Sequence, residues 1–265
     1  MPMEAEAEAG RGLRGFRIPG LARRRARIAE EKQARDIQTR LLQRQPPQLE
    51  GFDIACAWQP SAEVSGDYID VFELGPDRLA VCIADVSGKG MSAVLLTGRL
   101  QAAVREFAPG AESPAELCTQ VNQTLSGPGP QTRYVTMFYG VLERGGRRLR
   151  YESAGHCLPV LVRGDGGVEF PASFSGVIGI FSHWLYQNQE VELRAGDCLV
   201  LVTDGLLSAE NRRREEFGYK RLIATVEKAR VLGAVETSRE IVTAVAKFSG
   251  GKFRDDASLI VVRVA

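Results

Sequence analysis

The sequence predicts an α+β fold with mostly antiparallel sheets. Apolar runs typical of strands come in blocks separated by blocks of helical segments, whereas a parallel sheet would need strict βαβ alternation. The number of strand-like runs indicates two sheets. At 265 residues, with 44% hydrophobic and 25% charged residues, the chain is long enough to bury one full core.

The N-terminal part predicts a helix ahead of the globular domain. Leu21 to Gln45 contains no Pro or Gly and many helix formers, and it ends at Pro46-Pro47. Its residues Ala34, Ile37 and Leu41 form one apolar stripe, which could pack on the domain or pair with a second copy. We therefore divide the chain into a disordered segment (1–20), a regulatory or dimerisation linker helix (21–47) and a globular domain (48–265).

The first elements of the globular domain are a strand and a hairpin. Apolar and small residues alternate from Phe52 to Trp58, which indicates a strand. The apolar runs Tyr68 to Leu74 and Leu79 to Ala84 are joined by the turn Gly75-Pro76-Asp77 and predict a β-hairpin.

Two helices follow the hairpin. The first is expected from Met91 to Phe107. The second runs to about Leu125 and opens with a clear start signal, because Ser113 can cap it, Pro114 occupies the first helical position and Glu116 completes a capping box.

Strands dominate the second half, with two helices before the last of them. The expected helices are Tyr219 to Ala229 and Val235 to Phe248. The expected strands are Tyr134 to Leu142, Arg147 to Ser153, Pro159 to Arg163, Val168 to Phe170, Glu190 to Leu193, Cys198 to Thr203 and Ala257 to Val264.

The bulk properties argue against several classes of protein. A net charge of +1 gives no overall attraction to nucleic acid or to membranes. The five cysteines form no CxxC pair, which indicates buried thiols in a reducing compartment. No apolar stretch is long enough to cross a bilayer, and the N-terminus lacks the apolar centre of a secretory signal. We therefore expect a cytoplasmic protein.

Aspartates recur at the ends of the predicted strands. An Asp beside a Gly is also common in turns, so each aspartate taken alone is more readily explained as a turn residue than as a ligand. Together they favour a metal site, because clustered carboxylates repel one another unless cations bind. Oxygen ligands favour Mg²⁺ or Mn²⁺, and two such ions can activate a water as a nucleophile. A phosphate-binding P-loop is excluded, because Ile83 stands where its first Gly is required. The candidates are Asp67, Asp85, Asp204, Asp255 and Asp256.

Ordered motifs run through the chain. They are Ser65-Gly66-Asp67-Tyr68-Ile69-Asp70, Ala84-Asp85-Val86-Ser87-Gly88-Lys89-Gly90, Val135-Thr136-Met137-Phe138-Tyr139-Gly140, Ser153-Ala154-Gly155-His156, Thr203-Asp204-Gly205 and Asp255-Asp256-Ala257-Ser258. They resemble the motifs of the bacterial SpoIIE-like (RsbU-like) phosphatases, which belong to the PPM class of metal-dependent Ser/Thr protein phosphatases. The resemblance covers about residues 30 to 265 and implies an α-β-β-α sandwich, in which two stacked, mostly antiparallel sheets are flanked by helices.

The resemblance implies a role for each candidate residue. Asp85 would bridge two metal ions, and the Val86 carbonyl would bind one of them. Asp204 and Asp255 would complete the other, and Asp67 would hold metal-bound water or ligate directly. Two further residues would support the ligands: Asp256 from behind them, and Gly205 by letting the backbone pass close to the ions.

The implied activity is hydrolysis of phosphoserine or phosphothreonine on a protein, with anti-sigma-factor antagonists as the usual substrates. The alternative is a phosphatase-like module that binds a regulatory partner without catalysis. A third interpretation, a metal-dependent nuclease or cyclase, is not supported, because the sequence does not show the basic face that nucleic-acid binding needs.

Three features of the sequence are left open or depart from the family pattern. His156 could protonate the leaving group or only shape a turn. Ser65 and Cys157 stand where the family favours Gly and Pro. The basic segment Asn211-Arg212-Arg213-Arg214 is a solvated loop unless it faces the site.

Overall fold

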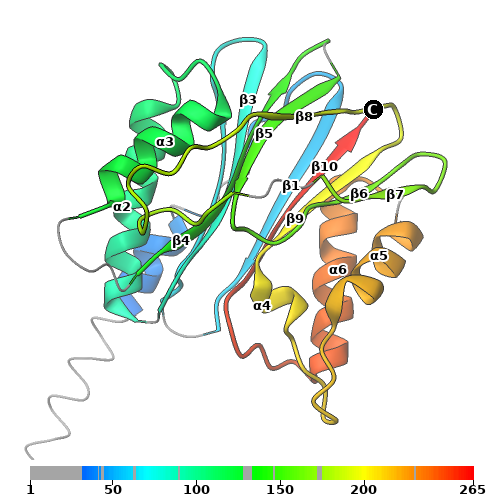
Figure 1. Ribbon diagram of the computed structural model, residues 1–265. Coiled ribbons are helices and arrows are strands. Elements are labelled where there is room, and N and C mark those ends of the chain that lie inside the picture. The colour runs from blue at the N-terminus through cyan, green and yellow to red at the C-terminus, as the bar shows by residue number, and fades with distance from the viewer. Residues whose placement is uncertain are drawn as a thin grey trace, which may run out of the picture.

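Two five-stranded antiparallel sheets stack face to face, and helices cover both outer faces (Figure 1). The α+β sandwich expected from the sequence is therefore confirmed. The computed structural model describes residues 32–40, 42, 45–61, 64–88, 90–127, 133–145, 147–171, 175–229 and 231–265. The predicted disordered segment and the first part of the predicted linker helix lie outside these residues.

The first sheet has the order β1-β10-β9-β6-β7 and is covered by the C-terminal helices. Helix α6 packs on β1 and β10, and α5 packs on β6. The elements are β1 (Phe52–Gln59), β6 (Val160–Val162), β7 (Val168–Glu169), β9 (Cys198–Val202), α5 (Gly218–Ala229), α6 (Ala234–Ser249) and β10 (Ala257–Val264).

The second sheet has the order β2-β3-β4-β5-β8 and is covered by the two helices that follow its hairpin. Helix α2 packs on β2 and β3, and α3 packs on β4 and β5. The elements are β2 (Asp67–Glu73), β3 (Arg78–Val86), α2 (Met91–Phe107), α3 (Pro114–Leu125), β4 (Val135–Glu143), β5 (Arg148–Ala154) and β8 (Gln189–Glu192).

Helix α3 begins directly after the N-cap residue that the sequence predicts. Ser113 Oγ accepts a hydrogen bond from the Glu116 backbone N–H at 3.3 Å, as its N-cap position predicts. The Glu116 carboxylate accepts from the backbone N–H of Glu112 at 2.7 Å, one residue earlier than a standard capping box. The cap therefore forms, with its reciprocal bond shifted by one position.

One helix was not predicted. The short helix α4 (Asp204–Leu207) begins directly after β9, where the sequence indicated only the end of a strand. A single helical turn has too few residues for a periodic pattern, so the sequence gives no signal for it.

The linker helix is only partly within the described residues. Residues 32–40 and Leu42 are helical, and Gln45 is not, so the helix ends before the predicted position. The two prolines that follow Gln45 disfavour helical backbone in the residue before them, which accounts for the earlier end. Ala34, Ile37 and Gln38 line a cavity shared with α2, so the helix lies against the domain.

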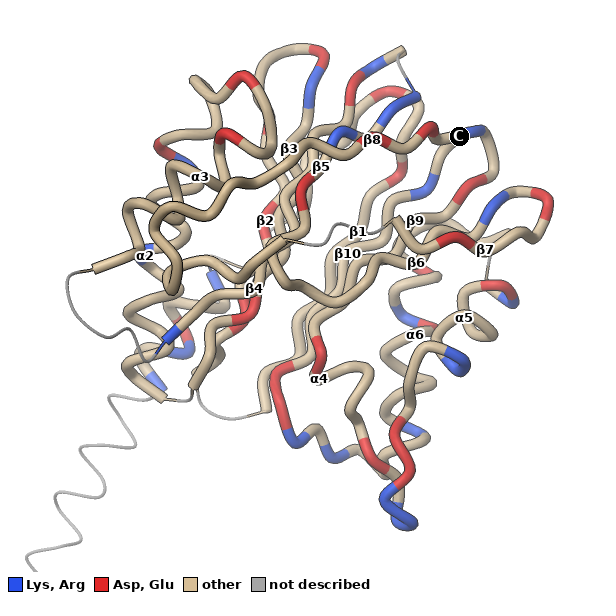
Figure 2. Tube along the Cα trace, in the orientation of Figure 1, with Lys and Arg blue, Asp and Glu red and all other residues tan. Residues whose placement is uncertain are grey.

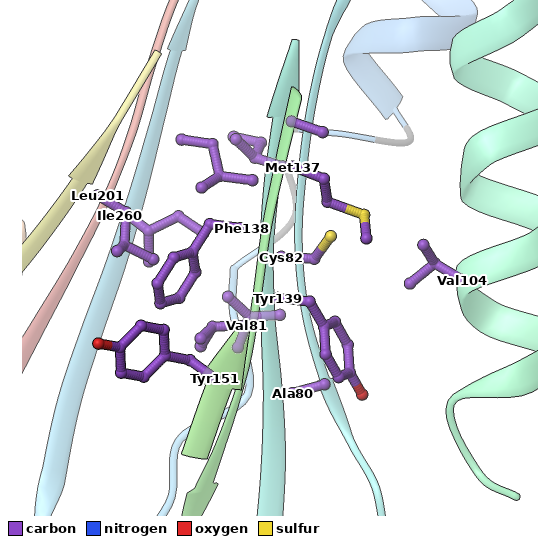
Figure 3. Close-up of a cluster of buried hydrophobic side chains, with 14 of the residues drawn as sticks. Ala80, Val81, Cys82, Val104, Met137, Phe138, Tyr139, Tyr151, Leu201 and Ile260 are labelled. Atoms are coloured by element: carbon purple, nitrogen blue, oxygen red, sulfur yellow. The ribbon is translucent and has the colours of Figure 1, made fainter. Parts of the chain in front are cut away.

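The strands β3 and β4 are buried on both faces. Phe138 and Tyr151 stack with ring centroids 5.3 Å apart and point toward Leu201 and Ile260 of the other sheet (Figure 3). Met137 points to the opposite side, toward the helices (Figure 3). Burying each such side chain contributes about 1.5–3 kcal/mol, so both the layer between the sheets and the layer beneath the helices stabilise the fold.

The described part of the chain contains no helix that is both long and apolar enough to cross a membrane.

Candidate functional site

The site begins with two aspartates on neighbouring strands. Asp67 opens β2 and Asp85 stands next to the end of β3, and the antiparallel register places the two residues directly opposite each other. Asp67 is buried and Asp85 is half-buried. The β2-β3 hairpin therefore brings together two of the predicted site residues.

The Asp67 carboxylate is held by two hydroxyl groups from the opposite sheet. Its Oδ2 accepts from Thr203 Oγ1 at 2.9 Å and from Ser258 Oγ at 2.5 Å. The Ser258 backbone N–H donates to Thr203 Oγ1 at 2.9 Å, so the three side chains form one network between the sheets. No role was assigned to Thr203 or Ser258 from the sequence, although each is a polar residue at the end of an apolar strand.

Burial raises the pKa of Asp67 well above its usual range, and the hydrogen bond from Ser258 acts in the opposite direction. The negative charges of Asp85 and Asp256 raise the pKa further, and the bond from Thr203 lowers it. The site thus concentrates negative charge that a nearby cation would stabilise.

The Val86 carbonyl faces this pair of aspartates across a glycine. A Cβ on Gly66 would lie 3.1 Å from the Val86 carbonyl oxygen and 3.8 Å from Asp85 Oδ1. A side chain at this position would crowd both oxygens. Gly66 therefore leaves room for a backbone carbonyl and a carboxylate to share one small space.

Asp204 and Asp255 arrive from the other sheet on two segments in close contact. Asp204 opens α4 and is exposed, and Asp255 is half-buried in the segment before β10. A Cβ on Gly205 would lie 2.1 Å from the Asp256 carbonyl oxygen, so only glycine allows this approach. The role predicted for Gly205 was to let the backbone pass close to the ions; the structure shows its close approach to the backbone of Asp256.

Asp256 ties this segment to the loop between β1 and β2. Its Oδ1 accepts from the Ser61 backbone N–H at 2.7 Å and from Ser61 Oγ at 3.0 Å. Its Oδ2 accepts from the Gly66 backbone N–H at 2.9 Å. Asp256 therefore positions the turn that carries Asp67, and it supports the site from behind.

The donor set fits a hard divalent cation. Its members are carboxylates and one backbone carbonyl, which Mg²⁺ and Mn²⁺ prefer, and the glycine at position 66 leaves space beside them. Within the described residues, no three His, Cys, Asp or Glu side chains are arranged to hold one ion together. The candidate residues come together in two pairs, Asp67 with Asp85 and Asp204 with Asp255. A ligand shell that combines both pairs is a proposal.

A comparison with protein-family sequence models identifies the family of this chain. The sequence model described as Stage II sporulation protein E (SpoIIE) matches residues 75–265. The chain belongs to the SpoIIE family.

Two relatives of known name align with most of this SpoIIE-family chain. The phosphoserine phosphatase RsbU of Bacillus subtilis is 28% identical over 233 residues, which are 87% of this chain and 68% of RsbU. Protein IcfG of Synechocystis sp. is 27% identical over 226 residues, which are 74% of this chain. The chain spans only 35% of the length of IcfG.

Solved structures show the same fold. The SiaA-PP2C domain of Pseudomonas aeruginosa superposes with a TM-score of 0.80 at 22% identity, over 92% of this chain and 99% of that domain. RsbX in complex with magnesium (TM-score 0.65, 18% identity, 83% and 99% covered) and the PstP catalytic domain with two manganese ions (0.58, 17%, 81% and 98%) also match. Those two neighbours were each solved with a divalent metal.

The SpoIIE-family pattern favours Gly at position 65, and the hydroxyl of the serine found here accepts hydrogen bonds. Ser65 Oγ accepts from Trp58 Nε1 and from the Asp67 backbone N–H, both at 3.1 Å. The Ser65 backbone in turn bonds to the linker helix. Gln38 Nε2 donates to the Ser65 carbonyl at 2.8 Å, and Gln38 Oε1 accepts from the Ser65 N–H at 2.9 Å. The linker helix is thus bonded to a residue two positions before Asp67.

Cys157 is a further residue beside the site. Burial raises the pKa of its thiol to about 12, and the negative charges of Asp204, Asp85 and Asp67 add to the effect. Cys157 is therefore a neutral thiol near neutral pH. The family favours Pro at this position. Nothing in the sequence indicated that the Cys157 side chain would lie near three of the candidate ligands.

The His156 side chain is buried rather than exposed to solvent. Its Nδ1 lies 3.0 Å from Thr136 Oγ1 on β4. Burial lowers the pKa of His156 to about 4, and hydrogen bonds to the backbone of Val202 and Thr136 partly offset this effect. A neutral, buried imidazole favours the interpretation that His156 shapes the turn over the one that it donates a proton.

This burial predicts a pH-dependent stability. The pKa of His156 in the folded state lies below its value in the unfolded chain, so its contribution is complete above about pH 6.5 and is lost as pH falls toward 4. Between pH 7.5 and 5 we expect His156 to reduce the free energy of unfolding by about 2 kcal/mol. Urea denaturation of the wild type and of His156→Gln at several pH values measures this effect. The difference between their free energies of unfolding should shrink as pH falls. The control is His183→Gln, because His183 is exposed. Equal slopes of the free energy of unfolding against pH for all three proteins would contradict the prediction.

Proposed function

We propose that the chain hydrolyses phosphoserine or phosphothreonine on a protein substrate with two Mn²⁺ or Mg²⁺ ions. The observation that carries this proposal is that Asp67 lies opposite Asp85 and also bonds to Thr203, which directly precedes Asp204, and to Ser258, three positions after Asp255. The 28% identity to the phosphoserine phosphatase RsbU supports it.

Each residue has a stated task in this proposal. Asp85, the Val86 carbonyl, Asp204 and Asp255 would hold the ions through their oxygen atoms. Bound ions would neutralise charge on the substrate phosphate and activate a water molecule. Asp67, oriented by its two hydroxyl partners, would hold water beside the ions or bind directly.

The substrate class that we carry forward is an anti-sigma-factor antagonist. The resemblance to SpoIIE-like phosphatases supports this choice. The competing function is a regulatory binding module that keeps the fold without turnover, and the retention of every acidic position argues against it.

The deciding experiment is release of phosphate from a phosphoserine peptide and from p-nitrophenyl phosphate. We expect turnover with Mn²⁺ or Mg²⁺ and loss of turnover after chelation with EDTA, recovered on adding metal. Absence of turnover at every metal concentration, together with metal-independent binding of a phosphorylated antagonist, would favour the binding module.

We further propose that the linker helix regulates this site. Its Gln38 bonds to Ser65, and Thr97 Oγ1 of α2 donates to the neighbouring Gly66 carbonyl at 3.0 Å. Movement of the helix would therefore reach the turn that carries Asp67. The same helix is our candidate for pairing with a second copy, which sedimentation of the full chain against residues 46–265 would test.

Replacing Gln38 by Leu tests the regulatory proposal. The variant leaves the buried Ser65 N–H and C=O without their partner, which costs about 1–3 kcal/mol of stability. If the turn is coupled to metal binding, the Mn²⁺ concentration for half-maximal activity should rise by about fivefold or more. Gln33→Leu, an exposed residue of the same helix, is the control. A stable Gln38→Leu protein with unchanged Mn²⁺ dependence would rule the coupling out.

A further inference from the structure

The loop between α4 and α5 is a small hairpin whose tip carries the consecutive arginines Arg212–Arg214. Glu210 and Glu216 form an antiparallel bridge at its base. The Phe217 backbone N–H donates to the Ala209 carbonyl at 2.9 Å and closes the hairpin next to α4. The basic segment noted in the sequence is therefore an ordered structure.

Asn211 holds the tip of this hairpin in one conformation. Its Oδ1 accepts from the backbone N–H groups of Arg213 at 2.8 Å and Glu215 at 3.1 Å. Its Nδ2 donates to Glu215 Oε2 at 2.8 Å, and its backbone carbonyl accepts from the Arg214 N–H at 3.0 Å. A turn with this many bonds displays its side chains in a defined direction.

The third arginine occupies a strained position. Arg214 has a φ of 61°, in the left-handed region that Gly and Asn adopt more readily than a residue with a long side chain. Arg214 thus places a long side chain where Gly or Asn would suit the backbone better.

The three arginines are exposed and have no carboxylate partner among the described residues. Two of the three carboxylates of the hairpin have other partners. Glu210 pairs with Arg254 at 2.5 Å, and Glu215 lies 3.8 Å from Arg221 as well as bonding to Asn211. The positive charge at the tip is therefore available to a partner.

The hairpin is attached to the two segments that carry candidate ligands. It continues directly from α4, which begins at Asp204, and its Glu210 is paired with Arg254, the residue before Asp255. Figure 2 shows Lys and Arg positions both at the tip of this loop and on the segment leading into β10. Exposed Lys252 belongs to that segment. Basic residues therefore lie both at the hairpin tip and on the segment that leads to Asp255.

We propose that this arginine hairpin, residues 210–216, docks an acidic segment of the phosphorylated protein substrate. The proposal rests on the proposed function. The carboxylates of the site repel an anionic substrate until metal is bound, and a cationic surface beside them attracts the substrate and orients it. The net charge of +1 makes this attraction local to the hairpin.

The first test is binding, which does not depend on turnover. The probe is a fluorescent, unphosphorylated glutamate-rich peptide, titrated with the full chain at low and high salt. The variant is Arg212→Gln/Arg213→Gln/Arg214→Asn, in which Asn suits the left-handed position. The control, Lys220→Gln/Lys228→Gln/Arg239→Gln, removes the same charge from exposed positions on α5 and α6. We expect at least a fivefold weaker affinity in the hairpin variant, wild-type affinity in the control, and loss of the difference at high salt.

The second test is selectivity in catalysis. Two phosphoserine peptides are compared, one flanked by glutamates and the other by glutamines. The wild type should prefer the acidic peptide in kcat/KM by about the factor seen in binding, and the hairpin variant should lose this preference while p-nitrophenyl phosphate turnover stays unchanged.

The outcomes separate the two proposals. Equal peptide affinity in the wild type and the hairpin variant, or equal loss in the control, overturns the docking site, as does tighter binding of a single-stranded oligonucleotide than of the acidic peptide. No turnover of any phosphopeptide overturns the proposed function, and the binding result still decides the docking site. If the triple variant does not fold, Arg212→Glu alone carries the same test.

Discussion

Replacing Asp85 by Asn is expected to abolish phosphatase activity, with a loss in kcat of about 100-fold or more. Asp85 lies opposite Asp67 on the neighbouring strand and beside the Val86 carbonyl, at the centre of the proposed ligand set. Asn keeps the size of the side chain but removes the negative charge that would hold two cations. Interactions of charge at such a site are worth several kcal/mol in the transition state, which is the source of the large factor.

The measurement is phosphate release over a series of Mn²⁺ concentrations, with metal affinity from calorimetry. Asp77→Asn is the matched control, because Asp77 lies in the turn at the other end of the same hairpin, where it is exposed and contacts Arg144 at 3.4 Å. The control should keep wild-type activity and affinity. Wild-type turnover in Asp85→Asn would show that the ligand assignment is wrong. A folded, inactive Asp85→Asn protein with lowered Mn²⁺ affinity would support it.

The fold could be predicted to a large extent because its signals are local. Strands such as β3 are buried on both faces and appear as continuous apolar runs, and α3 begins with a recognisable cap. The two-layer arrangement follows from the blocks of strands and helices. The pairing of β1 with β10, from opposite ends of the domain, has no local signal and needed the structure.

The candidate site could be predicted only in part. The aspartates are visible because each follows or precedes an apolar strand beside a turn. Thr203 and Ser258 were assigned no role because their function comes from the contact with Asp67, which is far away in sequence. The same holds for Gln38, whose partner Ser65 lies in another element. Groups that act through long-range contacts cannot be recognised from spacing alone.

Replacing Gly205 by Ala is expected to lower the free energy of unfolding by about 3 kcal/mol and to remove activity with it. The new Cβ would lie 2.1 Å from the Asp256 carbonyl oxygen and 2.9 Å from its carbonyl carbon, so α4 and the segment before β10 must move apart. Both neighbours are backbone atoms, which cannot rotate away as a side chain can. Overpacking of this kind typically costs about 1–3 kcal/mol, and the rigid surroundings favour the upper end.

Gly98→Ala in α2 provides the matched control. Gly98 is helical and a Cβ there would meet no atom within 4 Å, so the change should be neutral or stabilise by up to about 1 kcal/mol. Urea denaturation and the phosphatase assay are run on both variants. Wild-type stability in Gly205→Ala would contradict the close approach of the two segments.

The two readouts of Gly205→Ala also separate packing from metal binding. Asp204 and Asp255 stand on the segments that the Cβ would separate, and Asp67 stands on the opposite sheet. If only packing were affected, saturating Mn²⁺ would restore turnover at temperatures where the variant is folded. If the spacing of the ligands were affected, turnover would stay low in the folded variant at any Mn²⁺ concentration. We expect the second result, because the segments that would separate are the ones that supply both carboxylates of one proposed ion.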